Sequence, residues 1–295
     1  MASVQDLKRR IKSVRNTRKI TRAMELVAAA KLRRAQTRIE AMRPYAATMQ
    51  ELIAGVGRAS SSVRLPLLER RDEVANVLLV PLTGDRGLAG AFNAQVLRRA
   101  FTLERQLGAD GVGVQWLAVG KKGRSTLSFR RKAVVGEFVG FTDRPDYANA
   151  QAIAHRAAEL FTAGEVDRVV LVYNAYVSAL TQKVTEQDVL PISAEILATS
   201  EEEQADDTMR GDFIFEPEPE EILARLLPVY LETQLYRALL ESTASEQGAR
   251  MTAMRNASKN AGELIDGLTL SMNRARQSEI TQEILEVVGG AEALA

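Results

Sequence analysis

Residues 32–56 read LRRAQTRIEAMRPYAATMQELIAGV and carry the most regular pattern in the chain. Apolar or small side chains recur there in alternating steps of three and four, at Leu32, Ala35, Ile39, Met42, Ala46, Met49, Ile53 and Val56. This spacing is the heptad seam of a helix that packs against another helix. The stretch therefore predicts a coiled-coil helix. Pro44 predicts a kink within it, because the seam keeps its register through the proline.

The helical pattern extends upstream to the amino terminus. Heptad spacing holds at Val4, Leu7, Ile11 and Val14, and steps of four follow at Ile20, Met24, Ala28 and Leu32. Steps of four predict a four-residue stutter, which locally unwinds a left-handed supercoil. One helix from about residue 3 to about residue 57 accounts for both sets.

A second long helix is expected after the proline-rich segment EPEPEE of residues 216–221. Its apolar face is marked first by Ile222, Leu223, Leu226, Leu227, Tyr230, Leu231, Leu235 and Leu239, then by Met251, Met254, Ala257, Ala261, Leu264, Leu268, Met272 and Ala275. The only later stop signal is Gly289-Gly290. Helices of roughly 80 and 100 Å exceed the roughly 30–40 Å of a domain built from the other residues. The two ends are therefore expected to pair as an antiparallel coiled coil.

An α/β pattern lies between the two helices. Strands are expected at residues 74–80, 112–119, 133–139, 166–177 and 180–192, and helices at residues 92–107, 121–129 and 147–162. This alternation predicts a Rossmann-like α/β domain whose sheet is mostly parallel, with one antiparallel edge strand. The expected division is a coiled-coil helix (1–60), the α/β domain (61–198), an acidic linker (199–221) and a second coiled-coil helix (222–295).

Charge is strongly separated along a chain of 295 residues whose formal net charge is +1. Residues 1–43 hold thirteen Lys and Arg against three acids, and residues 200–221 hold ten acids against Arg210. The basic helix fits either the phosphates of RNA or an acidic protein surface. It has no aromatic side chains among these charges to stack on bases, which favours the protein surface.

The glycine-rich stretch LTGDRGLAGAFN of residues 82–93 raises the question of nucleotide binding. Its glycines are three apart, which matches neither the dinucleotide fingerprint nor the P-loop, and no lysine follows them. We instead expect a loop that displays Asp85 and Arg86 to a partner. A nucleotide-binding α/β domain with scaffold helices stays a weaker alternative.

No catalytic, metal or cofactor site is expected. The chain has no cysteine, and its single histidine, His155, falls on an amphipathic helix where a satisfied structural role is favoured. The dense carboxylates of residues 201–221 lie in the linker, where solvation is favoured over acid–base chemistry. No apolar run is long enough to span a bilayer.

Three motifs resemble the gamma subunit of bacterial F-type, proton-translocating ATP synthases. They are IKSVRNTRKITRAMELVAAAKL with RPYA at residues 43–46, the loop TGDRGLAGAFN, and ITQEILEVVGGA near the carboxyl end. The last fills every specified position of the family signature, with Ile280, Thr281, Glu283, Glu286, Gly290 and Ala291. Ala89 stands where many members have cysteine.

The resemblance implies a non-catalytic rotor shaft that couples proton flow through the membrane ring to ATP synthesis or hydrolysis at beta-subunit sites. It implies three alpha and three beta subunits, an epsilon subunit and a membrane c-ring as partners, with membrane contact only through the complex and a place on the cytoplasmic face of a bacterial cell membrane. The absence of a cleavable leader favours a bacterium over a mitochondrion. The implied contacts with the alpha–beta ring are Lys19, Met24, Asp85, Arg86, Arg276, Gln277, Thr281, Glu283 and Glu286. The alternative class is a nucleic-acid-binding protein with a basic coiled-coil arm.

Overall fold

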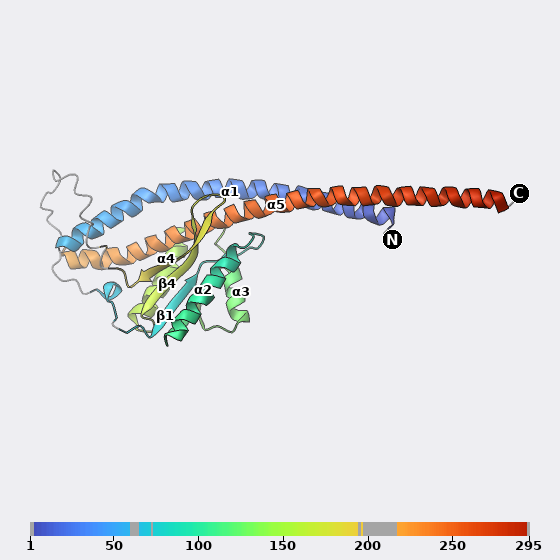
Figure 1. Cartoon of the computed structure of the whole chain (residues 1–295). Helices are drawn as coiled ribbons and strands as arrows, with labels where there is room; N and C mark the ends of the chain where they lie inside the picture. The colour runs from blue at the N-terminus through green and yellow to red at the C-terminus, as the bar shows by residue number, and fades with distance from the viewer. Residues whose placement is uncertain (1–2, 60–64, 72, 194–195, 197–216, 294–295) are drawn as a thin grey trace. The chain divides into compact units, whose positions relative to one another are not determined.

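The computed structural model describes residues 3–59, 65–71, 73–193, 196 and 217–293 (Figure 1). The chain forms two compact units. We call residues 1–29 with 250–295 the helix-pair unit, and residues 30–249 the sheet unit. Most of the expected acidic linker falls outside the described residues, and the expected four-part division of the chain stays a prediction.

Two long helices begin and end the chain and run through both units. They are α1 (Val4–Ala59) and α5 (Pro219–Ala293), and each contains one internal proline, Pro44 and Pro228. The elements between them are η1 (Pro66–Leu68), β1 (Asn76–Pro81), α2 (Phe92–Ala109), β2 (Gly113–Val119), α3 (Lys121–Phe129), β3 (Val134–Phe138), α4 (Tyr147–Thr162), β4 (Arg168–Tyr176) and β5 (Gln182–Leu190). Every expected strand and helix is present, with bounds shifted by at most three residues in this central part.

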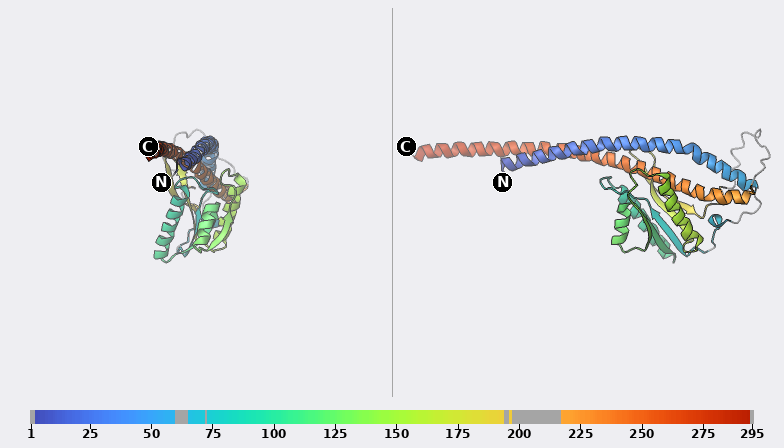
Figure 2. Two further views of the ribbon diagram at one scale, coloured as in Figure 1. Left: turned by 90° about the vertical axis from the view of Figure 1, so that its right-hand side faces the viewer. Right: turned by 180° about the vertical axis from the view of Figure 1, so that it is seen from behind.

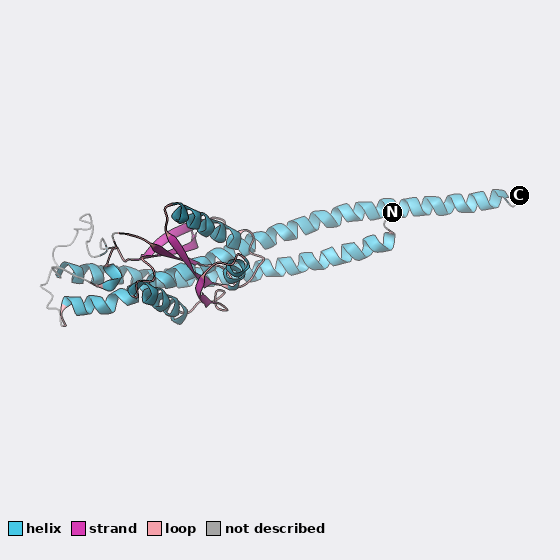
Figure 3. Ribbon diagram, turned by 90° about the horizontal axis from the view of Figure 1, so that it is seen from below, coloured by secondary structure: helices cyan, strands magenta, loops and turns pink. Residues whose placement is uncertain are grey.

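The sheet unit is built on one five-stranded sheet in the order β3-β2-β1-β4-β5. The pairs β1–β2, β1–β4 and β2–β3 are parallel, and β4–β5 is antiparallel. This confirms a Rossmann-like sheet with one antiparallel edge strand. Figure 3 shows the strands between helices on either side.

Each face of the sheet is covered by a different pair of helices. On one face Leu78, Val80 and Leu171 pack against α4 and against the apolar side of α5 around Leu231 and Leu235. On the other face alternate residues of the same strands, among them Trp116 and Val172, pack against α2 and α3. Successive residues of a strand point to opposite faces of the sheet and so lie in different cores. Because α5 packs on one of these faces, it serves as one layer of the α/β fold.

Both long helices are anchored within the sheet unit. The seam expected at residues 32–56 is confirmed: Leu32, Ala35 and Ile53 are buried. Met49, Ile53 and Val56 of α1 form one core with Leu223 of α5. Residues 231–249 of α5 are buried almost all round, because they have α1 on one side and the sheet with α4 on the other.

The helix-pair unit corrects the stutter that the sequence predicted. Ile20 is 60% exposed, whereas Thr21 and Glu25 are buried. The seam therefore runs from Leu7 to Val56 in unbroken heptad steps, and polar residues fill three of its positions, Arg18, Thr21 and Glu25. Apolarity alone selected Ile20, which lies one position off the seam.

A similar one-residue shift occurs in α5. Leu264, expected in the seam, is 53% exposed, and its neighbour Ile265 is buried. The glycine pair at residues 289–290 does not end the helix, which runs to Ala293. Figure 2 shows the carboxyl-terminal stretch of α5 extending past the amino-terminal end of α1.

Candidate coupling surfaces

The glycine-rich loop between β1 and α2 is organised around the Asp85 carboxylate. This carboxylate accepts hydrogen bonds from the backbone N–H groups of Lys121 (3.0 Å), Gly140 (2.9 Å) and Thr142 (3.0 Å), and from the Thr142 hydroxyl (3.0 Å). Burial raises the pKa of Asp85, but these hydrogen bonds outweigh it and hold the pKa below its ordinary value.

Asp85 fills the place that an anion would take in this loop. Lys121 is the first residue of α3, and a helix amino terminus attracts negative charge. Two further N–H donors of the loop are also satisfied internally: Gly84 donates to Asn93 (2.8 Å) and Asp85 donates to Thr142 Oγ1 (2.8 Å). The loop is therefore closed by the chain's own acceptors, which argues against a phosphate cradle.

Arg86 differs from Asp85, because it is exposed at the tip of the loop. Beside it Leu88 is 64% exposed and has a positive φ of 62°. A left-handed backbone is uncommon for leucine, and such outliers gather where a local shape is functionally required. The exposed tip, Arg86 with Leu88, is the part of this loop that can meet a partner.

A basic groove occupies the helix-pair unit. Its volume is about 1450 Å³. Apolar side chains from both helices line it, including Ile11 of α1 and Ile265 and Met272 of α5. Six cations surround them: Lys8, Lys12, Arg15, Arg18, Lys19 and Arg22. The groove thus has an apolar lining with a high density of positive charge around it.

A buried carboxylate interrupts the seam next to this groove. Glu25 accepts hydrogen bonds from Arg255 Nε of α5 (3.0 Å) and from Arg22 Nη1 of α1 (2.7 Å). The hydrogen bond from Arg255, with help from Arg22, lowers the pKa of Glu25 against the opposing effect of burial. A charge in a helix–helix seam costs desolvation, and its best-attested benefit is to fix register.

The carboxyl-terminal end of α5 presents a cluster of exposed apolar side chains. Glu25 of α1 contacts Arg255 of α5, and Arg18 of α1 lies beside Gly262 of α5. By this pairing, Val4 at the start of α1 lies opposite about position 276 of α5. Every described position from Arg276 to Gly289 is exposed. The large apolar residues among them are Ile280, Ile284, Leu285, Val287 and Val288.

Comparison with known proteins identifies the family of this chain. A family model described as ATP synthase matches residues 3–294. The chain is 46% identical over 295 residues to the ATP synthase gamma chain of Rubrobacter xylanophilus, covering 100% of this chain and 99% of the relative. The chain belongs to the ATP synthase gamma-chain family. It is also 44% identical over 315 residues to the ATP synthase gamma chain of Synechococcus elongatus, with 100% and 99% covered.

Solved structures agree with the family. A central stalk and c-ring structure of the Tetrahymena thermophila mitochondrial ATP synthase contains a chain with 30% identity and a TM-score of 0.59, covering 81% of this chain and 99% of that one. A chain in the Euglena gracilis mitochondrial ATP synthase has a TM-score of 0.68 at 19% identity, covering 99% and 94%, and shares the fold. Gamma chains are non-catalytic subunits of their complex.

The structure spreads the nine expected contact residues over both units. Lys19 and Met24 lie on α1 in the helix-pair unit, where Lys19 is exposed and Met24 is half-buried. Five lie on the free end of α5, all exposed: Arg276, Gln277, Thr281, Glu283 and Glu286. Asp85 and Arg86 lie in the sheet unit. Their contact role stays a prediction, and for Asp85 the geometry adds an internal role.

Sequence reasoning missed two polar networks. His155 is satisfied, as expected, but its partner is the buried Glu232 of α5 (3.1 Å), which also accepts from the hydroxyl of Tyr147 (2.6 Å). Burial, with the hydrogen bond to Glu232, raises the pKa of Tyr147. The second network is that of Glu25 and Arg255. Neither gives a sequence signal, because the partners are 77 and 230 residues apart.

The described part of the chain contains no helix that is both long and apolar enough to cross a membrane.

Proposed function

We propose that this chain is the central rotor shaft of an F-type ATP synthase, and that the helix-pair unit turns inside a ring of three alpha and three beta subunits. The observation that carries the proposal is the free end of α5. Five large apolar residues are exposed there on a helix without α1 beside it. Exposed apolar patches of this kind mark interaction sites, and a ring that encloses the helix would cover all of its sides at once.

The two surfaces of the helix-pair unit suit different contacts. The apolar end of α5 suits an apolar sleeve, in which Arg276, Gln277 and Thr281 face polar groups of the ring. The basic groove beside Lys19 and Met24 suits acidic segments of the ring, where charge sets orientation and rate of association more than affinity. Because the faces of this helix pair are unequal, rotation would present a different face to each beta subunit in turn.

The sheet unit would serve as the foot of the shaft, in contact with an epsilon subunit and the membrane c-ring. Proton flow would turn the ring and the foot together, so the chain reaches the membrane only through the complex. Its place would be the cytoplasmic face of a bacterial cell membrane. Arg86 and Leu88, at the exposed tip of the glycine-rich loop, would contact the ring of alpha and beta subunits.

Assembly with purified alpha and beta subunits tests the proposal. Replacing Ile284 and Leu285 by serine should weaken binding to the ring, because both side chains are more than half exposed in the free chain. Phe129→Ser is the matched control: this residue is 88% exposed on α3, outside the proposed ring contact. Equal binding of the Ile284–Leu285 variant and the parent chain would contradict the proposal.

Salt dependence separates the nucleic-acid alternative. A chain that grips phosphates through its basic helix would bind RNA with an affinity that falls steeply as salt rises. We expect no saturable RNA binding at any salt concentration.

A further inference from the structure

A single short loop in the sheet unit contacts both long helices and the glycine-rich loop. It comprises residues 140–146, between β3 and α4, and we call it the junction loop. Its Asp143 carboxylate binds a different helix with each oxygen: Oδ2 forms an ion pair with Lys31 of α1, and Oδ1 accepts a hydrogen bond from Gln247 Nε2 of α5 (2.8 Å). One side chain thus links α1 to α5.

Backbone groups of the junction loop add further contacts with the same helices. The Thr243 hydroxyl of α5 shares its proton between the carbonyl oxygen of Thr142 (2.9 Å) and that of Leu239 in its own helix (2.8 Å). Arg38 Nη1 of α1 donates to the carbonyl oxygen of Pro145 (3.4 Å). Thr243 and Gln247 are four residues apart and so lie on one face of α5. The loop is therefore held by two successive turns of one helix and by the other helix at the same time.

The sheet side of the junction loop is held by Asp85. Its carboxylate binds Gly140 and Thr142 of the loop as well as Lys121 at the start of α3. The backbone at Gly84 also lies directly against α5: a Cβ there would be 2.8 Å from the Glu246 carboxylate. Asp85 is thus a positioning residue that ties the carboxyl ends of the strands to the junction loop.

These bonds add direction to an interface that is largely apolar. Other polar contacts in it each involve one long helix only, as in Gln187 of β5 with Gln234 of α5 (3.2 Å) and Gln36 of α1 with Tyr176 of β4 (2.6 Å). Most of the contact between α5 and the sheet consists of apolar residues such as Leu231 and Leu235. Hydrophobic burial holds surfaces together but is non-directional, whereas hydrogen bonds fix angle and register. Lys31 and Asp143 are each about one-third exposed, so their pair adds little to stability. What it can supply is resistance to rotation of the sheet against the helices.

We propose that the junction loop is the joint that carries torque between the sheet and the two helices, with Asp143, Thr142 and Asp85 as its positioning residues. This rests on the proposed rotor function. In a shaft driven from its foot, torque must leave the sheet and enter α1 and α5. The junction loop is where polar contacts from both helices meet the carboxyl ends of the strands.

Asp143→Ala in the complete ATP synthase, reconstituted in vesicles, tests this proposal. The measured quantity is the ratio of ATP-driven proton pumping to ATP hydrolysis. If the contact were purely structural, its loss would reduce the amount of assembled enzyme but leave this ratio unchanged in the enzyme that does assemble. The ratio should fall by about twofold or more, as for substitutions along a coupling network. Asp188→Ala is the control. Asp188 is a carboxylate on the edge of the sheet whose two oxygens both bind Arg168 of β4 rather than a long helix, and its side chain is 52% exposed, against 34% for Asp143.

A charge exchange keeps the test decisive if Asp143→Ala assembles poorly. Lys31→Asp and Asp143→Lys should each lower the ratio, and the double variant should restore much of it. Three results would each overturn the proposal that the junction loop carries torque. They are an unchanged ratio in Asp143→Ala, an equal fall in Asp188→Ala, and no recovery in the double variant. If the parent chain itself supports no ATP-driven pumping, the rotor function fails, which distinguishes that failure from failure of the joint alone.

Discussion

Truncation of Ile53 tests the packing of α1 against α5 in the sheet unit. Ile53 is fully buried in a core with Met49, Val56 and Leu223, whereas its neighbour Leu52 is 52% exposed. Ile53→Ala removes three carbons, worth about 0.8 kcal/mol each in lost burial. The cavity left behind adds to this, so we expect a loss of about 3–4 kcal/mol. Leu52→Ala should cost less than about 1 kcal/mol, because half of the side chain is already in water.

Urea denaturation of the free chain, followed by circular dichroism of the helices, measures both variants. Ile53→Ala should lower the midpoint strongly while the slope of the transition stays unchanged, which indicates an effect on stability rather than on compactness. Leu52→Ala should leave the midpoint close to that of the parent. Similar midpoints for the two variants, or a larger loss in Leu52→Ala, would refute the assigned seam.

Three further substitutions test local features of the structure. The pKa of Glu25 is lowered in the folded chain, so its charge stabilises the fold above its ordinary pKa of 4.5, and this stabilisation is lost as pH falls through the lowered value. Glu25→Gln should therefore show a smaller fall in melting temperature on acidification than the parent chain. Parallel curves of melting temperature against pH for the two proteins would exclude this role. Gly120→Ala should destabilise by about 2 kcal/mol or more, since Gly120 has φ +86° and a Cβ would lie 2.0 Å from the carbonyl oxygen of Thr83. Gly111→Ala is its control, with φ +79° but no atom within 4 Å; it should cost only about 1 kcal/mol, and equal melting temperatures for the two would refute the close packing. Asp85→Ala should lower the free energy of unfolding by about 1–3 kcal/mol, because it leaves backbone N–H groups of the junction loop and of α3 without their acceptor. Hydrogen exchange at Gly140 and Thr142 should accelerate, and unchanged protection there would contradict the role of Asp85.

The parts of the fold that depend on periodicity were predictable from sequence. The heptad spacing of apolar residues at 32–56 predicted a helix seam, because helix packing is what produces that spacing. The strands of the sheet were predicted from short β-branched runs between helical patterns. The antiparallel edge strand followed from its closeness in sequence to β4. Each of these features was predictable because residues close together in the sequence carry its pattern.

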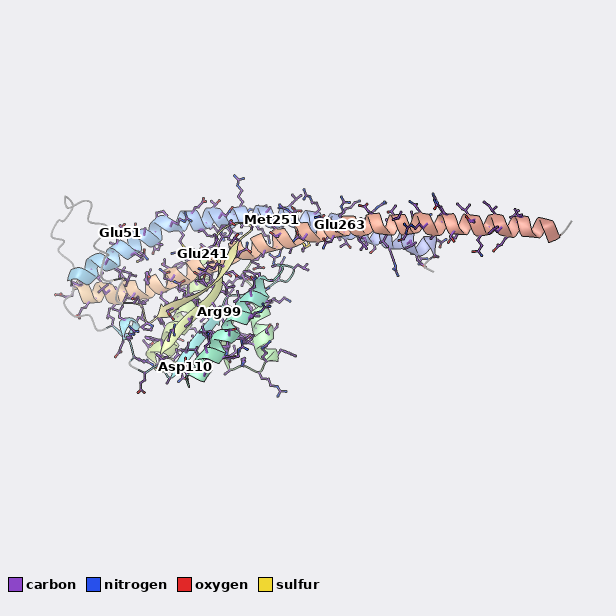
Figure 4. All side chains as sticks on the ribbon, in the orientation of Figure 1. Glu51, Arg99, Asp110, Glu241, Met251 and Glu263 are labelled. Atoms are coloured by element: carbon purple, nitrogen blue, oxygen red, sulfur yellow. The ribbon has the colours of Figure 1, made fainter. Side chains whose placement is uncertain are left out.

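What could not be predicted depends on partners that are distant in sequence. Ile20 was the better seam residue by hydropathy, and the burial of Glu25 becomes reasonable only once Arg255, 230 residues away, is beside it. Asp85 was expected to face a partner. That contact stays a prediction, but the Asp85 carboxylate also accepts hydrogen bonds from donors 36 to 57 residues further along the chain. Loop geometry of this kind leaves no periodic signal. Figure 4, with Glu51, Glu241 and Arg99 labelled on α1, α5 and α2, shows how densely side chains of the sheet unit fill the space between these elements.

Rotation of the chain inside an immobilised alpha–beta ring tests the central claim most directly. The chain has no cysteine, so a single cysteine at the exposed position Ser128 on α3 can carry a visible probe without competing labels. With ATP supplied, the rotor function predicts stepwise rotation of the probe in one direction, and rotation should stop when ATP is removed. A probe that stays fixed while the same ring hydrolyses ATP would contradict the account.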